Sequence, residues 1–545
     1  MDTVNMRCRR SAGAAFLILL VFSLAGCGAR ETRVQQGTRD GVLHIGNDAE
    51  PQELDPHLVT GVPEHRILLS LFEGLTTLDP KTLEPKPGVA ESWTVSDDQL
   101  VYTFTLRKDA RWSDGSPVTA QDFVYAWQRI LSPKLAAEYA YMLHCIQNAK
   151  AFNVGALTDF SQVGAKALDD YTLQVTLAHP TPSLLSMQVH SSWFPVKRAS
   201  IEKHGAIDVR NSGWTRPGEL ASNGPFKLTE WKPGLVIVVA KNEHYWDATS
   251  VKLNAVRFYP MEDLQTEERS FRSGDLHITG DMPIGKIPVY QRENSAALVI
   301  HPYLGTYFYR FNVTKPPFTD ARVRKAFALA LNRDEIVQNV TKGGERAASS
   351  FVPPDTAGYT SANAMPYDPD QARKLLAEAG FPNGQGLPPV ELLYNTSENH
   401  KLIAEAAAEM WKKELGVMVT LLNQDWKVYL SSMNALDYQM ARSAWVGDVL
   451  DPINFLECFL TGGGNNRTGW SSPQYDDRIA QAQQAADAGE RNRLLNEAEG
   501  ILLDEAPILP VYTYTRKFLK SPALKGWEPN ILGYVLYKNL SLGAS

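Results

Sequence analysis

Few residues of this 545-residue chain have the types and spacing that catalysis needs. The sequence contains no G-x-S-x-G, H-E-x-x-H, phosphate-binding-loop or C-x-x-C motif. Its 11 histidines are scattered, with no i, i+4 pair on an expected helix, so no metal site is indicated. Adjacent carboxylates at 97–98 and 476–477 lie beside turn residues, where a solvated surface is the better interpretation. We therefore expect neither an enzyme nor a cofactor.

Cys27 is the residue with the clearest expected chemistry. It follows three arginines within residues 7–10, an apolar run at 11–24 and two small residues, which is the pattern of a signal peptide. The run is too short for an ordinary spanning helix, although an N-terminal anchor helix is the alternative. Residues 24–27 resemble the bacterial lipobox, in which the cysteine is acylated and becomes the new N-terminus. The sequence thus predicts a signal peptide at 1–26 and a lipidated N-terminus with a polar linker at 27–42.

The composition is that of a soluble globular protein, with 44% hydrophobic and 21% charged residues. A net charge of −7 argues against a nucleic-acid reader with a basic face. The 12 Trp, 21 Tyr and 20 Phe suit large cores, and they also suit a cleft that holds a varied ligand. Beyond the signal region, Cys145 and Cys458 could form a disulfide in an exported protein or remain as two buried thiols.

Strand and helix patterns alternate from residue 42 to the end of the chain, which indicates an α/β fold. Residues 101–106 alternate with period two, as a strand does. Residues 120–130 place apolar side chains on one helical face after Thr119, a suitable N-cap. The other expected elements are strands at 42–46 and 235–239 and helices at 322–339, 370–379 (ended by Gly380) and 400–415 (ended by Gly416).

Several segments resemble the extracytoplasmic solute-binding proteins of the peptide, opine and nickel transport family. Together they run through the mature chain in order, at 54–57, 71–75, 90–129, 242–247, 317–337 and 374–382. Other segments resemble the oligopeptide-binding branch of that family, namely 61–64, 392–400, 423–427 and 441–452.

The resemblance implies a two-lobed periplasmic-binding-protein fold of class II, with a hinge and an additional subdomain. Lobe I is expected to comprise 43–74, 195–303 and 515–545, the extra subdomain 75–194, and lobe II 304–514. The implied function is capture of short peptides in the periplasm by a lipid-anchored monomer. That protein would deliver them to the permease of an ABC importer in the inner membrane, without contact with nucleic acid.

A peptide ligand offers an α-ammonium, a strand-like backbone and variable side chains. In the oligopeptide branch, an Asp a few residues after a Trp holds the ammonium, and the matching residues here are Trp445 and Asp448. The resemblance further implies backbone and pocket contacts from Trp445 and Val446, and pairing with the peptide from Val62 and Tyr139 on the other lobe. A loop carboxylate that caps a helix near residue 452 is the alternative role for Asp448.

Three residues stand at motif positions that suit the ligand carboxylate: Arg442, Asn395 and His400. The guanidinium of Arg442 can bind a carboxylate with two parallel hydrogen bonds, although a salt bridge within the protein is its alternative. A solvated histidine at the start of a helix is the alternative for His400.

The chain also departs from the branch at several positions. Thr60 and Arg310 stand where the branch carries acidic residues, and Gly305 and Val446 stand where it carries a cysteine pair. Other departures are at 279–281, Met433 and Asn434. Ligand preference therefore stays open, and murein peptides, opines, nickel chelates or haem are alternative ligands. A peptidase or a chaperone-like lipoprotein is the alternative from another functional class.

Overall fold

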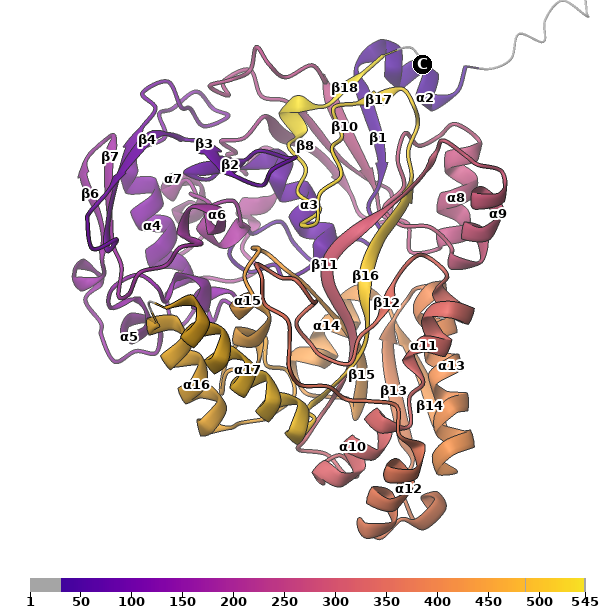
Figure 1. Ribbon diagram of the computed structural model, residues 1–545. Helices are drawn as coiled ribbons and strands as arrows, with labels where there is room; N and C mark the ends of the chain where they lie inside the picture. Colours follow the sequence, from indigo (N-terminus) through magenta and orange to yellow (C-terminus); the bar gives the residue numbers. More distant parts are fainter. Residues whose placement is uncertain (1–30, 486, 544–545) are drawn as a thin grey trace, which may run out of the picture.

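The computed structural model describes residues 31–485 and 487–543, so the predicted signal peptide and Cys27 lie outside the described residues. Three sheets of four or six strands organise this part of the chain, with helices around them (Figure 1). The predicted α/β class is confirmed. No helix of the described residues is both long enough and apolar enough to cross a membrane.

The first sheet has the strand order β1-β10-β9-β8. Its strands are β1 (Val42–Gly46), β8 (Phe226–Lys232), β9 (Val236–Lys241) and β10 (Ala255–Tyr259). The mostly β-branched run expected at 235–239 is β9, whose first four residues are buried. Helix α3 (Val62–Leu71) packs its apolar face under this region, with Ile67, Leu68 and Leu71 fully buried.

The second sheet is antiparallel, in the order β4-β5-β7-β6. It contains β4 (Ala90–Val95), β5 (Val101–Leu106), β6 (Ala165–Asp169) and β7 (Thr172–Thr176). Helix α4 (Ala120–Ile130) begins at the predicted cap, where Thr119 and Asp122 form a reciprocal capping box. Its buried face carries Phe123 and Trp127. Both the strand at 101–106 and the helix at 120–130 are therefore confirmed.

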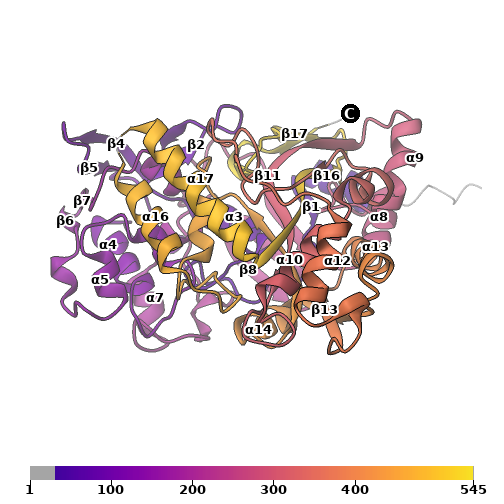
Figure 2. The ribbon, with the colours of Figure 1, turned by 60° about the horizontal axis from the view of Figure 1, so that its bottom comes forward.

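The third sheet is mixed and has the order β12-β16-β11-β15-β13-β14. Its strands are β11 (Leu298–Phe311), β12 (Arg346–Ala347), β13 (Val390–Asn395), β14 (Val419–Gln424), β15 (Met440–Val446) and β16 (Ile508–Leu519). The surrounding helices include α10 (Ala321–Leu329), α12 (Pro369–Glu378), α13 (Glu398–Leu415), α14 (Trp426–Asn434), α16 (Pro473–Gln484) and α17 (Ala488–Glu505). Figure 2 shows α16 and α17 on the side of the second sheet, with α12 and α13 on the opposite side.

Two long antiparallel strands, β11 and β16, connect the upper and lower parts of the molecule (Figure 1). We call the part around the six-stranded sheet lobe II and the part around the two four-stranded sheets lobe I. The β11–β16 register shifts between Pro302 and Thr306, and the boundaries predicted at 303/304 and 514/515 fall within these two strands. The domain boundaries themselves stay a prediction.

Two sequence predictions are wrong in part. The polar segment expected to be a linker forms helix α2 (Arg33–Asp40), which begins with a capping box between Thr32 and Gln35 and ends at Gly41 with φ 68°. The helix expected at 322–339 ends at Leu329. Asn332 then caps a new turn through the backbone N–H of Glu335, and a π-helix follows at 336–341.

The remaining sequence predictions on helices and cysteines have clear outcomes. Helices α12 and α13 are confirmed, and Gly380 and Gly416 follow them in the left-handed region. Cys145 and Cys458 are both buried and free, so the structure shows two thiols and no disulfide between them.

Candidate functional site

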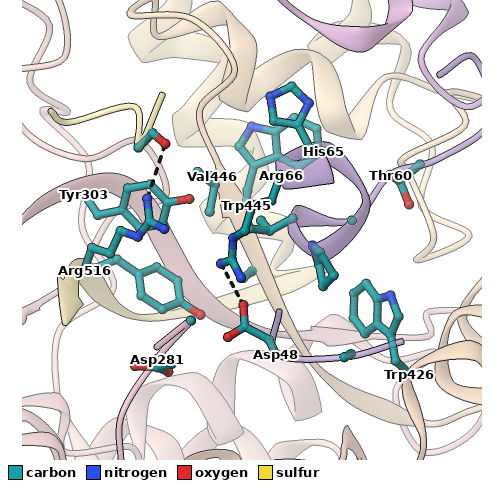
Figure 3. A pocket seen from close by; sticks show the side chains of 18 of the residues that line it. Asp48, Thr60, His65, Arg66, Asp281, Tyr303, Trp426, Trp445, Val446 and Arg516 are labelled. Atoms are coloured by element: carbon teal, nitrogen blue, oxygen red, sulfur yellow. Dashed lines mark hydrogen bonds and ion pairs between the residues drawn. The ribbon is translucent and has the colours of Figure 1, made fainter. Parts of the chain in front are cut away.

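A cavity of about 360 Å³ lies between the lobes and is lined by both of them (Figure 3). The structure brings all eight predicted site residues to its wall: Val62, Tyr139, Asn395, His400, Arg442, Trp445, Val446 and Asp448. Of the departures from the oligopeptide branch, Thr60, Gly280 and Arg310 also line it. The expectation that Met433 helps to reshape the pocket is wrong, because this side chain is buried in a small apolar cluster with Tyr429 and Leu430.

Strand β15 presents a free backbone edge to this cavity. On one side it pairs with β11 from Met440 to Val446, while on the other side its pairing with β13 ends at Ala441. Residues 442–446 therefore have one edge that pairs with no strand of the described part of the chain. Four residue steps span about 13 Å, so the edge could pair with a peptide of about four residues. Gly305 lies directly opposite Val446, in the positions where the branch carries its cysteines.

Asp448 follows the end of β15 and is nearly enclosed, with 14% of its side chain exposed. The side chain of Asn454 bonds to both the backbone and the carboxylate of Asp448. Its Oδ1 accepts from the Asp448 N–H at 2.9 Å, and its Nδ2 donates to Asp448 Oδ2 at 3.4 Å. The alternative role in capping a helix belongs instead to Asp451, whose Oδ1 accepts from the Ile453 N–H at 3.0 Å. Asp448 is thus free to serve the cavity.

The charge of Asp448 is not compensated by a permanent cation among the described residues. Its nearest basic atom is Nε2 of His190, at 3.4 Å. Burial, helped by the charge of the stacked His65, holds the pKa of His190 well below its usual range, so this imidazole is neutral near pH 7. Burial also raises the pKa of Asp448 to about 7, against the opposing hydrogen bonds of Asn454 and Tyr139. A ligand cation beside Asp448 would relieve this cost.

Arg442 is a cation of the cavity wall without an acidic partner. Its Nη1 donates to Asn395 Oδ1 at 3.2 Å, its Nη2 donates to the Tyr514 hydroxyl at 2.8 Å, and its guanidinium lies 4.9 Å from the ring centroid of Tyr307. No carboxylate within residues 31–485 and 487–543 lies within 4.0 Å of the Arg442 guanidinium. The alternative role of Arg442 in an internal salt bridge is therefore wrong as far as the described residues are concerned. The Nε atom of Arg442 is buried and has no hydrogen-bond partner among the described residues, so the guanidinium can donate to a further acceptor.

His400 and Arg442 both lie beside the ring of Tyr307. His400 is half-buried rather than solvated, its ring centroid is 5.7 Å from that of Tyr307, and its Nδ1 is buried without a partner among the described residues. Burial, followed by the charges of Arg442 and Lys517, holds the pKa of His400 well below its usual range. A neutral imidazole here can donate or accept one hydrogen bond from a ligand.

Lobe I supplies the opposite wall of the cavity. Val62 opens α3 directly after the cap residue Gly61 and is 42% exposed. The ring of Tyr139 lies 6.1 Å from that of Trp445 and 4.5 Å from that of His190, measured between centroids. Residues from both lobes therefore meet around Asp448.

Several lining residues were missed by the sequence reasoning. Figure 3 shows Asp48 and Arg66 paired at the cavity wall, near Arg516 and Tyr303. The Arg66 Nη2 atom lies 2.9 Å from Asp48 Oδ2. His190 was also missed, because nothing in its local sequence indicates that it meets Asp448, which lies 258 residues further along the chain. Within the described residues, no three His, Cys, Asp or Glu side chains gather as a metal site would need.

Direct contacts between the lobes accompany the cavity. Trp426 Nε1 donates to Glu64 Oε1 at 3.2 Å, and Asn399 of α13 exchanges two hydrogen bonds of 3.0 Å with the backbone of Met282 and Ile284. Burial raises the pKa of the Glu64 carboxyl. These contacts place the lobes in a closed arrangement around the cavity.

An α/β fold with two lobes joined by long strands and closed around a cavity defines a binding protein of the two-lobed type. The family model described as bacterial extracellular solute-binding proteins, family 5 middle, matches residues 84–467. The chain belongs to this family. It is 39% identical over 546 residues to the dipeptide-binding protein DppE of Bacillus subtilis, an alignment that covers 97% of this chain and 98% of that one.

Solved structures of relatives confirm the two-lobed fold. The complex of Haemophilus influenzae OppA with the peptide RPPGFSPFR superposes with a TM-score of 0.87, at 33% identity, covering 92% of this chain and 99% of that one. The unliganded open form of the murein tripeptide binding protein MppA gives a TM-score of 0.61, at 37% identity, covering 92% and 97%. The higher score against the peptide complex agrees with the closed arrangement of the lobes.

Proposed function

We propose that this protein is the peptide-capturing component of an ABC importer, anchored to a membrane through Cys27. The observation that carries the proposal is Asp448, an enclosed carboxylate that has no permanent cation beside it within residues 31–485 and 487–543 and lies just beyond the unpaired edge of β15. An α-ammonium at Asp448 and a backbone along residues 442–446 would satisfy both features at once.

The carboxylate end of the ligand is assigned to the Arg442 end of the unpaired edge of β15. Arg442, with Asn395 and His400 beside it, offers a cation without an acidic partner and hydrogen-bonding groups within the same cavity. Val62 and Tyr139 would contact the peptide from lobe I. A ligand that touches both lobes stabilises the closed form relative to the open one, because only contacts specific to one state shift the equilibrium.

The names of relatives support peptides as the ligand class. The relatives above are named for a dipeptide, an oligopeptide and a murein tripeptide, and another relative is titled an oligopeptide ABC transporter protein. Capture followed by delivery to a permease requires no covalent step, so no enzyme activity and no cofactor is assigned. We place the protein in the periplasm or at the outer face of the cell envelope, as a monomer.

Mass spectrometry of ligand released from the protein after purification from its cells tests the function. We expect a mixture of short peptides with free N-termini. An opine, a nickel chelate or haem as the principal ligand would contradict the proposal. Incubation of a tripeptide with the protein should leave the peptide intact, whereas cleavage products would indicate a peptidase.

The lipid anchor is tested separately. Metabolic labelling with a palmitate analogue should label the wild-type protein and should fail for Cys27→Ser, with Cys145→Ser as the matched control that retains the label. Labelling of Cys27→Ser would contradict the anchor without affecting the proposal of peptide capture.

A further inference from the structure

Two arginines of lobe II, Arg310 and Arg467, line the cavity on the side of Trp445 and Asp448. Arg310 projects from β11 and is 5% exposed, and its Nη2 donates to the Ser443 hydroxyl at 2.8 Å. Ser443 is two residues before Trp445 on β15, so both side chains lie on one face of the strand. The two arginines thus lie beside the path assigned to the peptide.

The hydrogen-bonding capacity of both guanidinium groups is largely unused. Beyond Ser443, Arg310 reaches only the Asn465 carbonyl, at 3.5 Å, while Arg467 Nη2 reaches the Thr60 hydroxyl of lobe I, at 3.4 Å. The Nε atoms of both residues are buried without a partner among residues 31–485 and 487–543. Since each guanidinium carries five N–H donors, an additional acceptor is needed to satisfy them.

Neither arginine has a carboxylate within 4.0 Å among the described residues. Glu138 is the carboxylate whose charge acts on Arg467; its Oε1 lies 3.8 Å from Arg210, and its Oε2 is buried without a hydrogen bond among the described residues. Burial lowers the pKa of Arg467, and the charge of Arg310 lowers it further. Arg310 is buried and Arg467 is half-buried, and two neighbouring cations in such surroundings are costly unless an anion joins them.

We propose that Arg310 and Arg467 form a subsite for a carboxylate side chain of the bound peptide, so that the protein prefers acidic peptides. This inference rests on the proposed peptide function. The planar guanidinium groups suit a carboxylate because each can donate two parallel hydrogen bonds.

A carboxylate at this subsite could come from a side chain or from the peptide C-terminus, and calorimetry with matched tripeptides separates the two. Alanine tripeptides carrying Glu or Gln at the first, second or third position are titrated into the full-length protein, with free and with amidated C-termini. At one position we expect the Glu peptide to bind about tenfold more tightly than the Gln peptide, and we expect this ratio to persist after amidation.

Glu-to-Gln affinity ratios within about threefold at all three positions would overturn the inference. A preference that disappears on amidation would also overturn it, because the arginines would then hold the terminal carboxylate. If no tripeptide binds, including the alanine peptide, the proposed function itself fails. Binding of the alanine peptide without a preference for Glu refutes only the acidic subsite.

Two variants test the residues independently, in case one of them does not fold. Arg310→Gln and Arg467→Gln should each reduce the Glu-to-Gln ratio toward one, with folding verified by thermal melting. Arg493→Gln is the matched control, since Arg493 is exposed on α17 and pairs with Glu490 and Glu497 outside the cavity. An unchanged ratio in a folded Arg310→Gln or Arg467→Gln protein would contradict the assignment.

Discussion

Replacement of Asp448 by Asn removes the proposed ammonium anchor while the shape of the side chain is kept. The carboxylate is 14% exposed, so its pair with a ligand ammonium is nearly desolvated. Removing one partner of such a hydrogen-bonded charge pair costs about 2–5 kcal/mol of binding free energy. At about 1.4 kcal/mol for each factor of ten, the Kd for a short peptide should rise roughly 30-fold to 4,000-fold.

The same substitution should stabilise the ligand-free protein. Burial raises the pKa of Asp448 from 3.8 to about 7 in the folded state, so its ionisation disfavours folding. This destabilisation is absent below the unfolded pKa, grows as the pH rises from about 4 to 7, and is complete above 7. Asp448→Asn should therefore melt at a higher temperature than the wild type at pH 8, and the difference should vanish near pH 4.

Titration calorimetry and thermal melting measure the two effects on one protein sample. Asp437→Asn is the matched control, because Asp437 is 78% exposed and pairs with Lys315 outside the cavity. Wild-type peptide affinity in the Asp448→Asn protein would refute the anchor. A large loss of affinity together with a large loss of stability would indicate a structural role for the carboxylate instead.

Three further predictions concern pH, the carboxylate end and lobe closure. Peptide affinity should be highest between about pH 7 and 8. It should fall at lower pH because Asp448, whose pKa is about 7, takes up a proton, and at higher pH because the peptide α-amino group loses its proton. Calorimetry across about pH 5–9 measures both changes, and an affinity independent of pH would contradict the prediction. Arg442→Gln should weaken binding of free-acid tripeptides by about tenfold or more, and should leave their C-terminal amides nearly unaffected in the same assay. Trp426→Phe removes the N–H that reaches Glu64 across the lobes, so small-angle scattering should show a larger radius of gyration for the ligand-free protein, whereas an unchanged radius would count against this contact as a closing interaction.

Local patterns predicted many elements correctly, because their signals are contained in short segments. Thr119 and the apolar face of 120–130 were sufficient for α4. The capping box at Thr32 and the N-cap residue Asn332 are equally local signals, and they indicate α2 and the end of α10. Polar composition alone favours a linker at 33–40, and apolar periodicity alone continues the helix past Leu329, whereas the caps define where each element begins.

The candidate site was predictable only in part. All eight predicted site residues, from Val62 to Asp448, line the cavity, because the family resemblance carries long-range information that periodicity lacks. The contact between Asp448 and His190 was not predictable, since His190 approaches from the other lobe and no local pattern indicates it. The position of Arg467 beside Arg310 likewise depends on tertiary packing.

The most direct test of peptide capture compares one tripeptide with its N-acetylated form by calorimetry on the wild-type protein. Acetylation removes the α-ammonium and leaves the backbone, the side chains and the C-terminus unchanged. An ammonium held by Asp448 predicts that the acetylated peptide binds at least about 30-fold more weakly. Equal affinity for the two peptides would contradict the account.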